Sequence, residues 1–433
     1  EKKIIRNSNL SIKQGAIAPI SQNTSDWILQ QIELIGKKYN FTLNTPLCEI
    51  PSIGIESIMY GINDTLKVNL KSAGISKLYK LKFDGIVNFI EDQAKSRVKS
   101  VQKWAEKYMS EFVNVNEVDL YRIIKYQLGW EDEFGNNSNV TQDLNRTYSS
   151  IVLETCLIFS DDIKPSYQFA TSVEILANSW YVHEDVQSGI TERSGRSSVW
   201  WAWGPAQGIN TGDGLHALAR LCLLENNSKF NDSILLKALS IFDSSYLTLC
   251  EGENLDIDYQ ESPLVKEEDF MIMLKKKSGS LSSCAFQFGY ISSNQKAKDI
   301  SEKKLRIIKE LGEISGIIRE LNSQSLIINS ENLPTEIFHR FSSKKKNIIT
   351  TYLLNNSDVS VKRKIGEMYF KRVLEVNDLE ELKKEALSSN FNDYFINLID
   401  QYKARSMDIV NDLGLNDLQN KKLLNIVFPD EPF

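Results

Sequence analysis

VEILANSWYVHEDVQSGITERSGRSSVWWAW, the stretch from Val173 to Trp203, decides the fold. Its first half is expected to form a helix that carries Glu184 and Asp185, with Ser188 one turn further on. Because residues four positions apart lie on one face of a helix, oxygen ligands are expected to gather near the end of this helix. Carboxylate oxygen atoms in such a place can hold Mg²⁺ together with the oxygen atoms of a phosphate group. Oxygen ligands placed in this way are compatible with a metal site.

The same stretch resembles, without a gap, the first aspartate-rich motif of the trans-isoprenyl diphosphate synthase (polyprenyl synthetase) family. The family pattern is Glu-x-x-His, then His-Asp-Asp-x-x-Asp and, after four residues, Arg-Arg-Gly. Here Glu184 stands at the first aspartate position, Asp185 at the second and Ser188 at the last. The resemblance implies that Mg²⁺ and nearby cations stabilise the departing pyrophosphate of an allylic prenyl diphosphate.

Four further motifs follow in the family's order, so the resemblance extends from about Asp119 to Pro429. They are Asn210–Asp213, Gly252–Asp256, Met273–Leu281 and Lys344–Ile349. Apolar residues also recur at helical spacing from Arg146 almost to the C-terminus. The expected fold is all-α, an isoprenoid-synthase-type helical bundle around a central cavity, with extra N-terminal helices.

The chain is expected to consist of two parts. Residues 1–75 are interpreted as an N-terminal helical extension of unknown role, and residues 76–433 as the synthase-like all-α domain. Helical spacing predicts helices over Ser25–Tyr39 and Ile53–Leu66, and a long helix over Lys77–Phe112.

Charge and composition argue against several classes of protein. The formal net charge of −6 gives no reason to expect a nucleic-acid partner. No apolar run reaches the ~20 residues that a membrane-spanning helix needs, so no integral membrane segment is expected. The five cysteines lack metal-ligand spacing, which favours a reduced, cytoplasmic setting.

The cations expected to bind one diphosphate are present, and those for a second are missing. The resemblance assigns Arg193, Lys277 and Lys345 to the allylic diphosphate. In the family, isopentenyl diphosphate is held by a basic loop, by the histidine of Glu-x-x-His and by the second arginine of Arg-Arg-Gly. Here the loop lacks its basic cluster, the histidine is Ala177 and the arginine is Ser194. The implied site takes a single substrate, one allylic prenyl diphosphate.

The second aspartate-rich motif lacks both aspartates, since Ser323 and Gln324 occupy their positions. Asn322, Ser325 and Asn329 lie at i, i+3 and i+7 on one helix face. This spacing resembles the Asn/Ser/Glu metal triad of class I terpene synthases. The alternative is a polar helix face that binds no metal.

The depth of the expected cavity depends on residues before Glu184. By the resemblance, Ala177, Trp180 and Tyr181 line the pocket, and the two bulky rings imply a short one. A pure packing role for both rings is the alternative.

Three functions are carried forward. The leading one is a class I terpene-synthase-like enzyme, with Glu184, Asp185 and Arg193 as catalytic residues, that binds one allylic prenyl diphosphate with Mg²⁺ and cyclises or quenches the cation. The alternative is a non-catalytic regulatory subunit of a heteromeric prenyl diphosphate synthase. The third is a chain-elongating prenyltransferase. The expected assembly is a homodimer or a heteromer with another synthase subunit.

Overall fold

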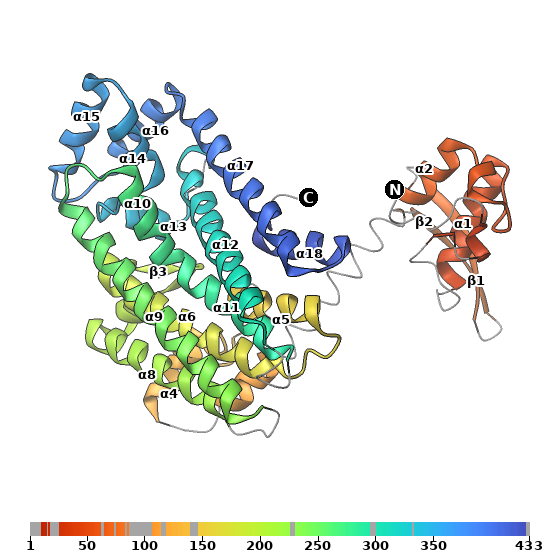
Figure 1. Ribbon diagram of the computed structural model, residues 1–433, viewed down its shortest axis with the longest axis horizontal. Helices are drawn as coiled ribbons and strands as arrows, with labels where there is room; N and C mark the ends of the chain where they lie inside the picture. Colours follow the sequence, from red (N-terminus) through yellow and green to blue (C-terminus); the bar gives the residue numbers. More distant parts are fainter. Residues whose placement is uncertain are drawn as a thin grey trace. The chain divides into compact units, whose positions relative to one another are not determined.

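The computed structural model divides into two compact units, residues 1–100 and 101–433, and each has a hydrophobic core of its own (Figure 1). The structure describes residues 10–14, 16–17, 26–61, 65–72, 75–82, 85, 106–113, 118–138, 146–225, 230–294, 300–330 and 333–429. Of residues 26–31 and of the two strands between 65 and 82, it describes the backbone alone.

The N-terminal unit combines short helices with a β-hairpin. Its elements are η1 (Ile12–Gln14), α1 (Asp26–Tyr39), η2 (Leu47–Glu49), α2 (Ser52–Tyr60), β1 (Thr65–Ser72) and β2 (Ile75–Lys82). The strands pair antiparallel, with Thr65 opposite Lys82 and Ser72 opposite Ile75. Ile35, Phe41 and Ile58 are among the residues of its small core. These residues bring α1 and α2 together.

Two expectations for this region are wrong. The helix expected over Ile53–Leu66 ends at Tyr60, and the helix expected from Lys77 begins instead as strand β2. The physical reason is the period of the sequence: apolar and polar residues alternate from Leu66 to Lys71, as is typical of a strand. Apart from residue 85, residues 83–105 of that expected helix lie outside the described part of the chain, and residues 106–113 are helical.

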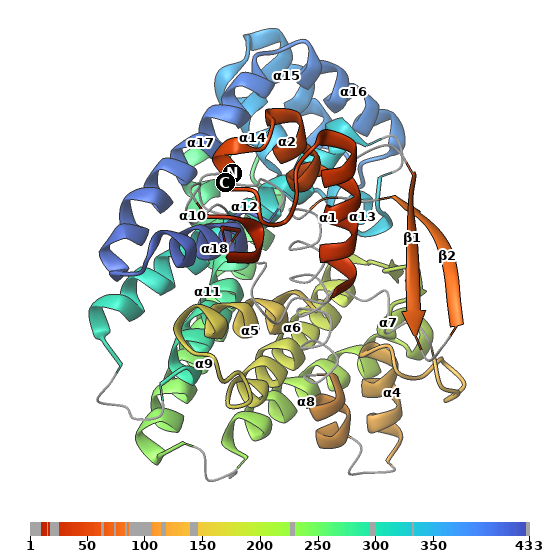
Figure 2. The same cartoon turned by 90° about the vertical axis from the view of Figure 1, so that its right-hand side faces the viewer.

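The C-terminal unit is built from helices, as expected. They are α4 (Asp119–Gln127), α5 (Thr147–Phe159), α6 (Ser166–Ser188), α7 (Val199–Trp203), α8 (Pro205–Leu224), α9 (Asp232–Glu261), α10 (Glu267–Leu274), α11 (Ser280–Ser292), α12 (Glu302–Asn329), α13 (Thr335–Ser342), α14 (Ile348–Asn356), α15 (Val359–Tyr369), α16 (Val376–Leu387), α17 (Phe391–Val410) and α18 (Asp417–Val427). Figure 2 shows α14–α17 at one end of this unit and α4 and α8 at the other. The all-α expectation is confirmed.

Helix α11 lies at the centre of the bundle. It packs against α5, α6, α9 and α12, and every one of its residues is buried. Many of these residues are small, such as Ser282, Ser283 and Gly289, so the neighbouring helices can approach closely. Phe286 and Phe288 supply most of its apolar volume. This arrangement places α6 and α12 on two sides of a common core.

A π-helical turn, η4 (Lys275–Gly279), joins α10 to α11 in one continuous helix. Two glycines on the neighbouring helices allow the backbone to come close. A Cβ at Gly252 of α9 would lie 2.5 Å from the amide nitrogen of Lys277, and one at Gly316 of α12 would lie 2.1 Å from the carbonyl oxygen of Ser278. Only a residue without a Cβ permits such approaches. The backbone of Lys277 is therefore fixed from both sides.

A tight hairpin follows α6. Its strands are β3 (Glu192–Arg193) and β4 (Arg196–Ser197), with Arg193 paired to Arg196. The two residues between them, Ser194 and Gly195, have φ angles of 51° and 72°. Positive φ at both central positions is typical of the type I′ turn, which suits the twist of a two-stranded ribbon. The turn holds Arg193 next to the end of α6.

Helix α9 is the one helix among the described residues with the length and hydropathy to cross a membrane. In the structure it packs against α8, α10 and α11. Leu236, Leu247 and Ile257 on its other side are exposed. It is a bundle helix with an uncovered apolar face.

Candidate functional site

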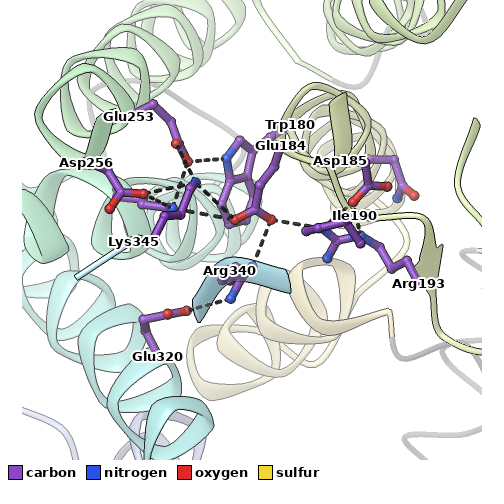
Figure 3. Close-up of polar contacts among 12 residues, drawn as sticks. Trp180, Glu184, Asp185, Ile190, Arg193, Glu253, Asp256, Glu320, Arg340 and Lys345 are labelled. Atoms are coloured by element: carbon purple, nitrogen blue, oxygen red, sulfur yellow. Dashed lines mark hydrogen bonds and ion pairs between the residues drawn. The ribbon is translucent and has the colours of Figure 1, made fainter. Parts of the chain in front are cut away.

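Glu184, near the end of α6, lies at the centre of a buried cluster of charges (Figure 3). Its Oε2 is 2.9 Å from Nη2 of Arg193 and 2.8 Å from Nη2 of Arg340. Its Oε1 is 3.5 Å from Nζ of Lys277 and 3.9 Å from Nζ of Lys345. Burial alone would raise the pKa of Glu184, but the four cations together hold that pKa well below its ordinary value. This carboxylate stays ionised.

Asp185 shares Arg193 with its neighbour. Its Oδ1 accepts hydrogen bonds from Nε and Nη2 of Arg193, at 2.8 and 2.6 Å. Its Oδ2 is buried and has no hydrogen-bond partner among the described residues. Burial outweighs the attraction of Arg193 and raises the pKa of Asp185 to about 6. The guanidinium of Arg193 also lies over the ring of Tyr181, 4.9 Å from its centroid.

Helix α9 contributes a second pair of acids. The ammonium groups of Lys277 and Lys345 lie 2.7 and 3.0 Å from Oδ2 of Asp256. Glu253 lies 3.2 Å from Lys277, and its Oε1 accepts a hydrogen bond of 2.8 Å from the indole nitrogen of Trp180. Burial would raise the pKa of Asp256, yet the two lysines lower it below its ordinary value. These contacts align the two lysines toward Glu184.

Arg340 on α13 is a site residue that the sequence analysis missed. It donates to Glu184 through Nη2, and its Nη1 lies 3.6 Å from Oε2 of Glu320 on α12. Burial would lower the pKa of Arg340, but Glu184 and Glu320 raise it well above its ordinary value. The only sequence signal is a basic residue five positions before Lys345, outside every motif quoted above.

We refer to these nine residues as the ion cluster. It comprises Glu184, Asp185, Arg193, Glu253, Asp256, Lys277, Glu320, Arg340 and Lys345. The structure thus brings together all five charged residues that the sequence analysis named, from α6, β3, η4 and the loop before α14. It adds two acids from α9, one from α12 and the arginine of α13.

The three residues of the polar triad expected from the sequence lie on α12, in different surroundings. Asn322 lines a cavity, but the hydroxyl of Ser325 donates to the carbonyl oxygen of Asn322 within its own helix, at 2.7 Å. Asn329 is exposed near the end of α12. Gln324, at a lost aspartate position, accepts a hydrogen bond from the backbone nitrogen of Ile348 at 2.8 Å. Of the three, only Asn322 is among the residues that line the cavity.

A cavity of about 1010 Å³ opens beside the ion cluster. Asp185, Arg193 and Arg340 reach it, as do Trp180 and Tyr181. Ala177 is fully buried and is not part of its wall. Most of the other lining residues are polar, among them Gln127, Ser150, Glu154, Asn178, Ser282, Arg319 and Asn322. The cavity is therefore unlike the apolar pocket expected for a prenyl chain alone.

Two further arginines line this cavity. Arg146 is paired with Glu106, Nη2 to Oε1, at 2.7 Å, so its charge is already neutralised. Arg196 donates to the backbone oxygens of Tyr126 and Gln127. The sequence analysis singled out neither.

The residues of the ion cluster do not fit the magnesium ions that the resemblance implies. Each oxygen of Glu184 already faces two cations, so a divalent cation would have to displace them to reach this carboxylate. The lost aspartates of α12 leave no opposing carboxylates at the positions of Ser323 and Gln324. Among the described residues, no group of three or more His, Cys, Asp or Glu side chains has the geometry of a metal site.

The comparisons agree with the helical fold. Residues 139–318 match the family model described as polyprenyl synthetase. A geranylgeranyl diphosphate synthase from Saccharolobus solfataricus is 27% identical over 276 residues, which cover 63% of this chain and 81% of that protein. A short chain isoprenyl diphosphate synthase from Methanocaldococcus jannaschii is 24% identical over 240 residues, covering 54% and 69%.

The crystal structure of a polyprenyl synthetase from Streptomyces coelicolor has a TM-score of 0.64 at 19% identity, covering 77% of this chain and 97% of that one. A geranylgeranyl pyrophosphate synthetase from Pyrococcus horikoshii has a TM-score of 0.63 at 19% identity, covering 78% and 98%. These similarities show the fold.

The N-terminal segment is similar to a different protein. Residues 1–107 match the model described as the UvrA DNA-binding domain. The UvrABC system protein A of Clostridium tetani is 33% identical over 95 residues, which cover 21% of this chain and 10% of that protein. The polyprenyl synthetase match begins after this segment, and residues 139–318, which carry six of the nine residues of the ion cluster, are similar to the polyprenyl synthetase family of trans-isoprenyl diphosphate synthases.

Proposed function

We propose that the C-terminal unit binds one allylic prenyl diphosphate at the ion cluster and passes its prenyl group to a nucleophile in the adjacent cavity. The observation that carries this proposal is the convergence of four cations on one buried carboxylate at the wall of that cavity. Similarity to a family of prenyl diphosphate enzymes supports the choice of substrate.

The ion cluster can accept a diphosphate because the carboxylate groups of two of its acids can swing out of the cluster. The side chains of Glu253 and Glu320 retain 13% and 16% of their exposure, whereas Glu184 is fully buried. When phosphate oxygen atoms contact the lysines and arginines, Glu253 and Glu320 can turn toward water. Four cations then face three carboxylates, and the negative ligand completes the charge balance.

The same cations would assist departure of the pyrophosphate. Negative charge grows on the leaving oxygen as the carbon–oxygen bond breaks, and fixed positive groups in a buried site stabilise it. Arg193 is held by the β3–β4 turn and by Tyr181, so little reorganisation is needed. No step of this proposal uses Mg²⁺, because Glu184 is already occupied by cations.

The polar cavity favours quenching of the prenyl cation over cyclisation. Cyclisation needs walls that expose no nucleophile, whereas this cavity presents hydroxyl, amide and carboxylate groups. Water is the simplest acceptor, and a larger polar acceptor fits the volume. This is the quenching branch of the terpene-synthase-like expectation.

One observation favours a second candidate, the non-catalytic subunit. Both carboxylates of the first motif are held by Arg193, and α12 offers no aspartates opposite them. A chain that only tunes a catalytic partner has no need of free carboxylates. Chain elongation, the activity named for the relatives, is the third candidate and requires isopentenyl diphosphate as a second substrate.

Product analysis separates the three candidates. The purified chain is incubated with geranyl, farnesyl or geranylgeranyl diphosphate, with and without isopentenyl diphosphate, in EDTA and in Mg²⁺, and products are identified by mass spectrometry. A prenyl alcohol or adduct that forms without isopentenyl diphosphate supports the proposal. Longer prenyl diphosphates would establish elongation, and no product under any condition would favour the subunit.

Matched variants test whether the ion cluster is responsible. Lys277→Ala removes a buried cation, whereas Lys276→Ala removes its exposed neighbour, which pairs with Glu251. We expect product to fall by at least about tenfold in Lys277→Ala and to stay near wild type in Lys276→Ala. Equal losses in both variants would show that the reaction occurs elsewhere.

A further inference from the structure

Arg340 connects the two helices that face each other across the site. Glu184 belongs to α6 and Glu320 to α12, and the guanidinium lies between them, 2.8 Å from one carboxylate and 3.6 Å from the other. Its Nε is buried and has no hydrogen-bond partner in the described part of the chain. A single cation therefore bridges acids from two walls.

A bridging divalent ion would need carboxylates on both walls. On α12 the aspartate positions hold Ser323 and Gln324, and the amide oxygen of Gln324 is already used by the backbone of Ile348. The acid that α12 does offer, Glu320, already faces Arg340 and accepts a hydrogen bond of 2.9 Å from the amide nitrogen of Gln324. On α6 the oxygen atoms of Glu184 are surrounded by cations. The space between the walls is therefore filled by a side chain whose positive charge does not dissociate.

We propose that Arg340 takes the place of a bridging metal ion, so that the ion cluster binds a diphosphate without any divalent cation. This inference rests on the proposed function. Arg340 and Arg193 both reach the cavity wall, so a diphosphate that enters from the cavity meets their guanidinium groups first. Guanidinium groups offer several N–H donors in a plane and match phosphate oxygen atoms in pairs. Lys277 and Lys345 lie behind these two arginines and supply the remaining positive charges around the diphosphate.

A competition between arginine and metal follows from this geometry. As long as Arg340 lies between Glu184 and Glu320, its positive charge occupies the place where a divalent ion would bridge the two carboxylates. When Arg340 is removed, Oε2 of Glu184 keeps only Arg193, and Glu320 loses the cation that it faces, so a divalent ion can approach both carboxylates. Removal should therefore weaken metal-free binding and create a dependence on Mg²⁺ that the wild-type protein lacks.

Calorimetric titration of the full chain tests this. The ligands are inorganic pyrophosphate and a non-hydrolysable geranyl thiolodiphosphate, each in EDTA and in Mg²⁺. Wild type is expected to bind with dissociation constants that agree within about twofold in the two buffers. Arg340→Ala is expected to bind at least about tenfold more weakly in EDTA and to regain part of that loss in Mg²⁺.

Two further variants keep the result interpretable. Arg405→Ala removes an exposed arginine that pairs with Glu310 on the surface and should bind as wild type does in both buffers. Arg340→Lys retains a positive charge and should retain metal-free binding, with a loss of less than about tenfold. Circular dichroism and a thermal melt check that Arg340→Ala is folded, and if it is not, wild type and Arg340→Lys still decide the question.

The outcomes are distinct. Wild-type binding that requires Mg²⁺ overturns the inference about Arg340 but leaves the proposed function standing. Folded Arg340→Ala that binds in EDTA as tightly as wild type also overturns it. Absence of binding by wild type in both buffers overturns the inference and the proposed function together.

Discussion

At the scale of single residues, Asp185 is a group whose pKa lies in a mildly acidic range. One of its oxygen atoms is bound by Arg193, and the other is buried without a partner, which is why its pKa rises to about 6. An aspartate in the unfolded chain has a pKa of 3.8. Between these two values the folded protein keeps a proton that the unfolded chain has lost.

The free energy of unfolding should reflect this difference. The contribution of Asp185 is fully present below about pH 4 and decreases as the pH rises toward 6, by on the order of 2–3 kcal/mol. Asp185→Asn removes this titration. Urea unfolding between pH 4.5 and 7 should show the variant gaining stability relative to wild type as the pH increases. Asp161→Asn, at an exposed position, is the control, and a constant difference between Asp185→Asn and wild type would contradict the expectation.

Lys277 is expected to matter for stability as well as for binding. Its removal leaves the fully buried Asp256 with only Lys345 as a cation, and an uncompensated buried charge costs about 3–5 kcal/mol. Lys277→Ala should therefore unfold at markedly lower denaturant concentration. The double variant Lys277→Ala, Asp256→Asn should recover part of the loss, because the excess carboxylate is gone. A double variant no more stable than the single one would show that the two residues are not coupled.

At the scale of elements, helix identity was largely predictable and the contacts of the ion cluster were only partly so. The helical period from Arg146 onward predicted the bundle, and the ordered motifs identified Glu184, Arg193 and Lys345. Arg340 was missed because its role depends on where α13 lies, which no local pattern encodes. The β1–β2 hairpin was missed although its alternation was readable, because lysines flank apolar residues in amphipathic helices too.

The close approach of α12 to η4 gives an element-scale prediction. In Gly316→Ala the new methyl group would collide with the carbonyl oxygen of Ser278, 2.1 Å away, and α12 would have to shift. Backbone collisions of this kind cost about 1–3 kcal/mol or more. Gly366→Ala on α15 is the matched control, since nothing lies within 4 Å of its new atom, and it should be stabilised by about 0.5–1 kcal/mol. The melting temperatures of both variants test this prediction. Similar changes in melting temperature in the two variants would contradict the packing argument.

At the scale of the whole molecule, the outer surface of α8 and α9 carries more apolar residues than a monomer needs. Ile209 and Leu221 of α8 are 50% and 60% exposed, and Leu236 and Leu247 of α9 are 65% and 62% exposed. The two helices pack together and are joined by an ion pair of 2.7 Å between Arg220 and Asp243. Exposed apolar side chains on two helices that pack together point to an interaction site.

We expect this surface to mediate self-association, which is one of the two assemblies expected from the sequence, a homodimer or a heteromer with another synthase subunit. Leu236→Glu with Leu247→Glu places charges in the middle of it and should shift the chain to a monomer in light-scattering measurements. Val376→Glu, at a position of α16 that is 59% exposed, is the control and should leave the assembly unchanged. A wild-type chain that is already monomeric at high concentration would refute the expectation.

The π-helical turn η4 also has a consequence for how the helix from α10 to α11 is phased. One extra residue in a single turn rotates everything after it by about 100° relative to a regular α-helix. The turn therefore sets which residues of α11 face the neighbouring helices independently of α10. Lys277 can point at Glu184 while the small residues of α11 still face its neighbours. Deleting Lys276 would restore a regular α-helix and rotate α11 about the helix axis relative to α10. The orientation of the buried lysine and the packing of the central helix are thus governed by one inserted residue.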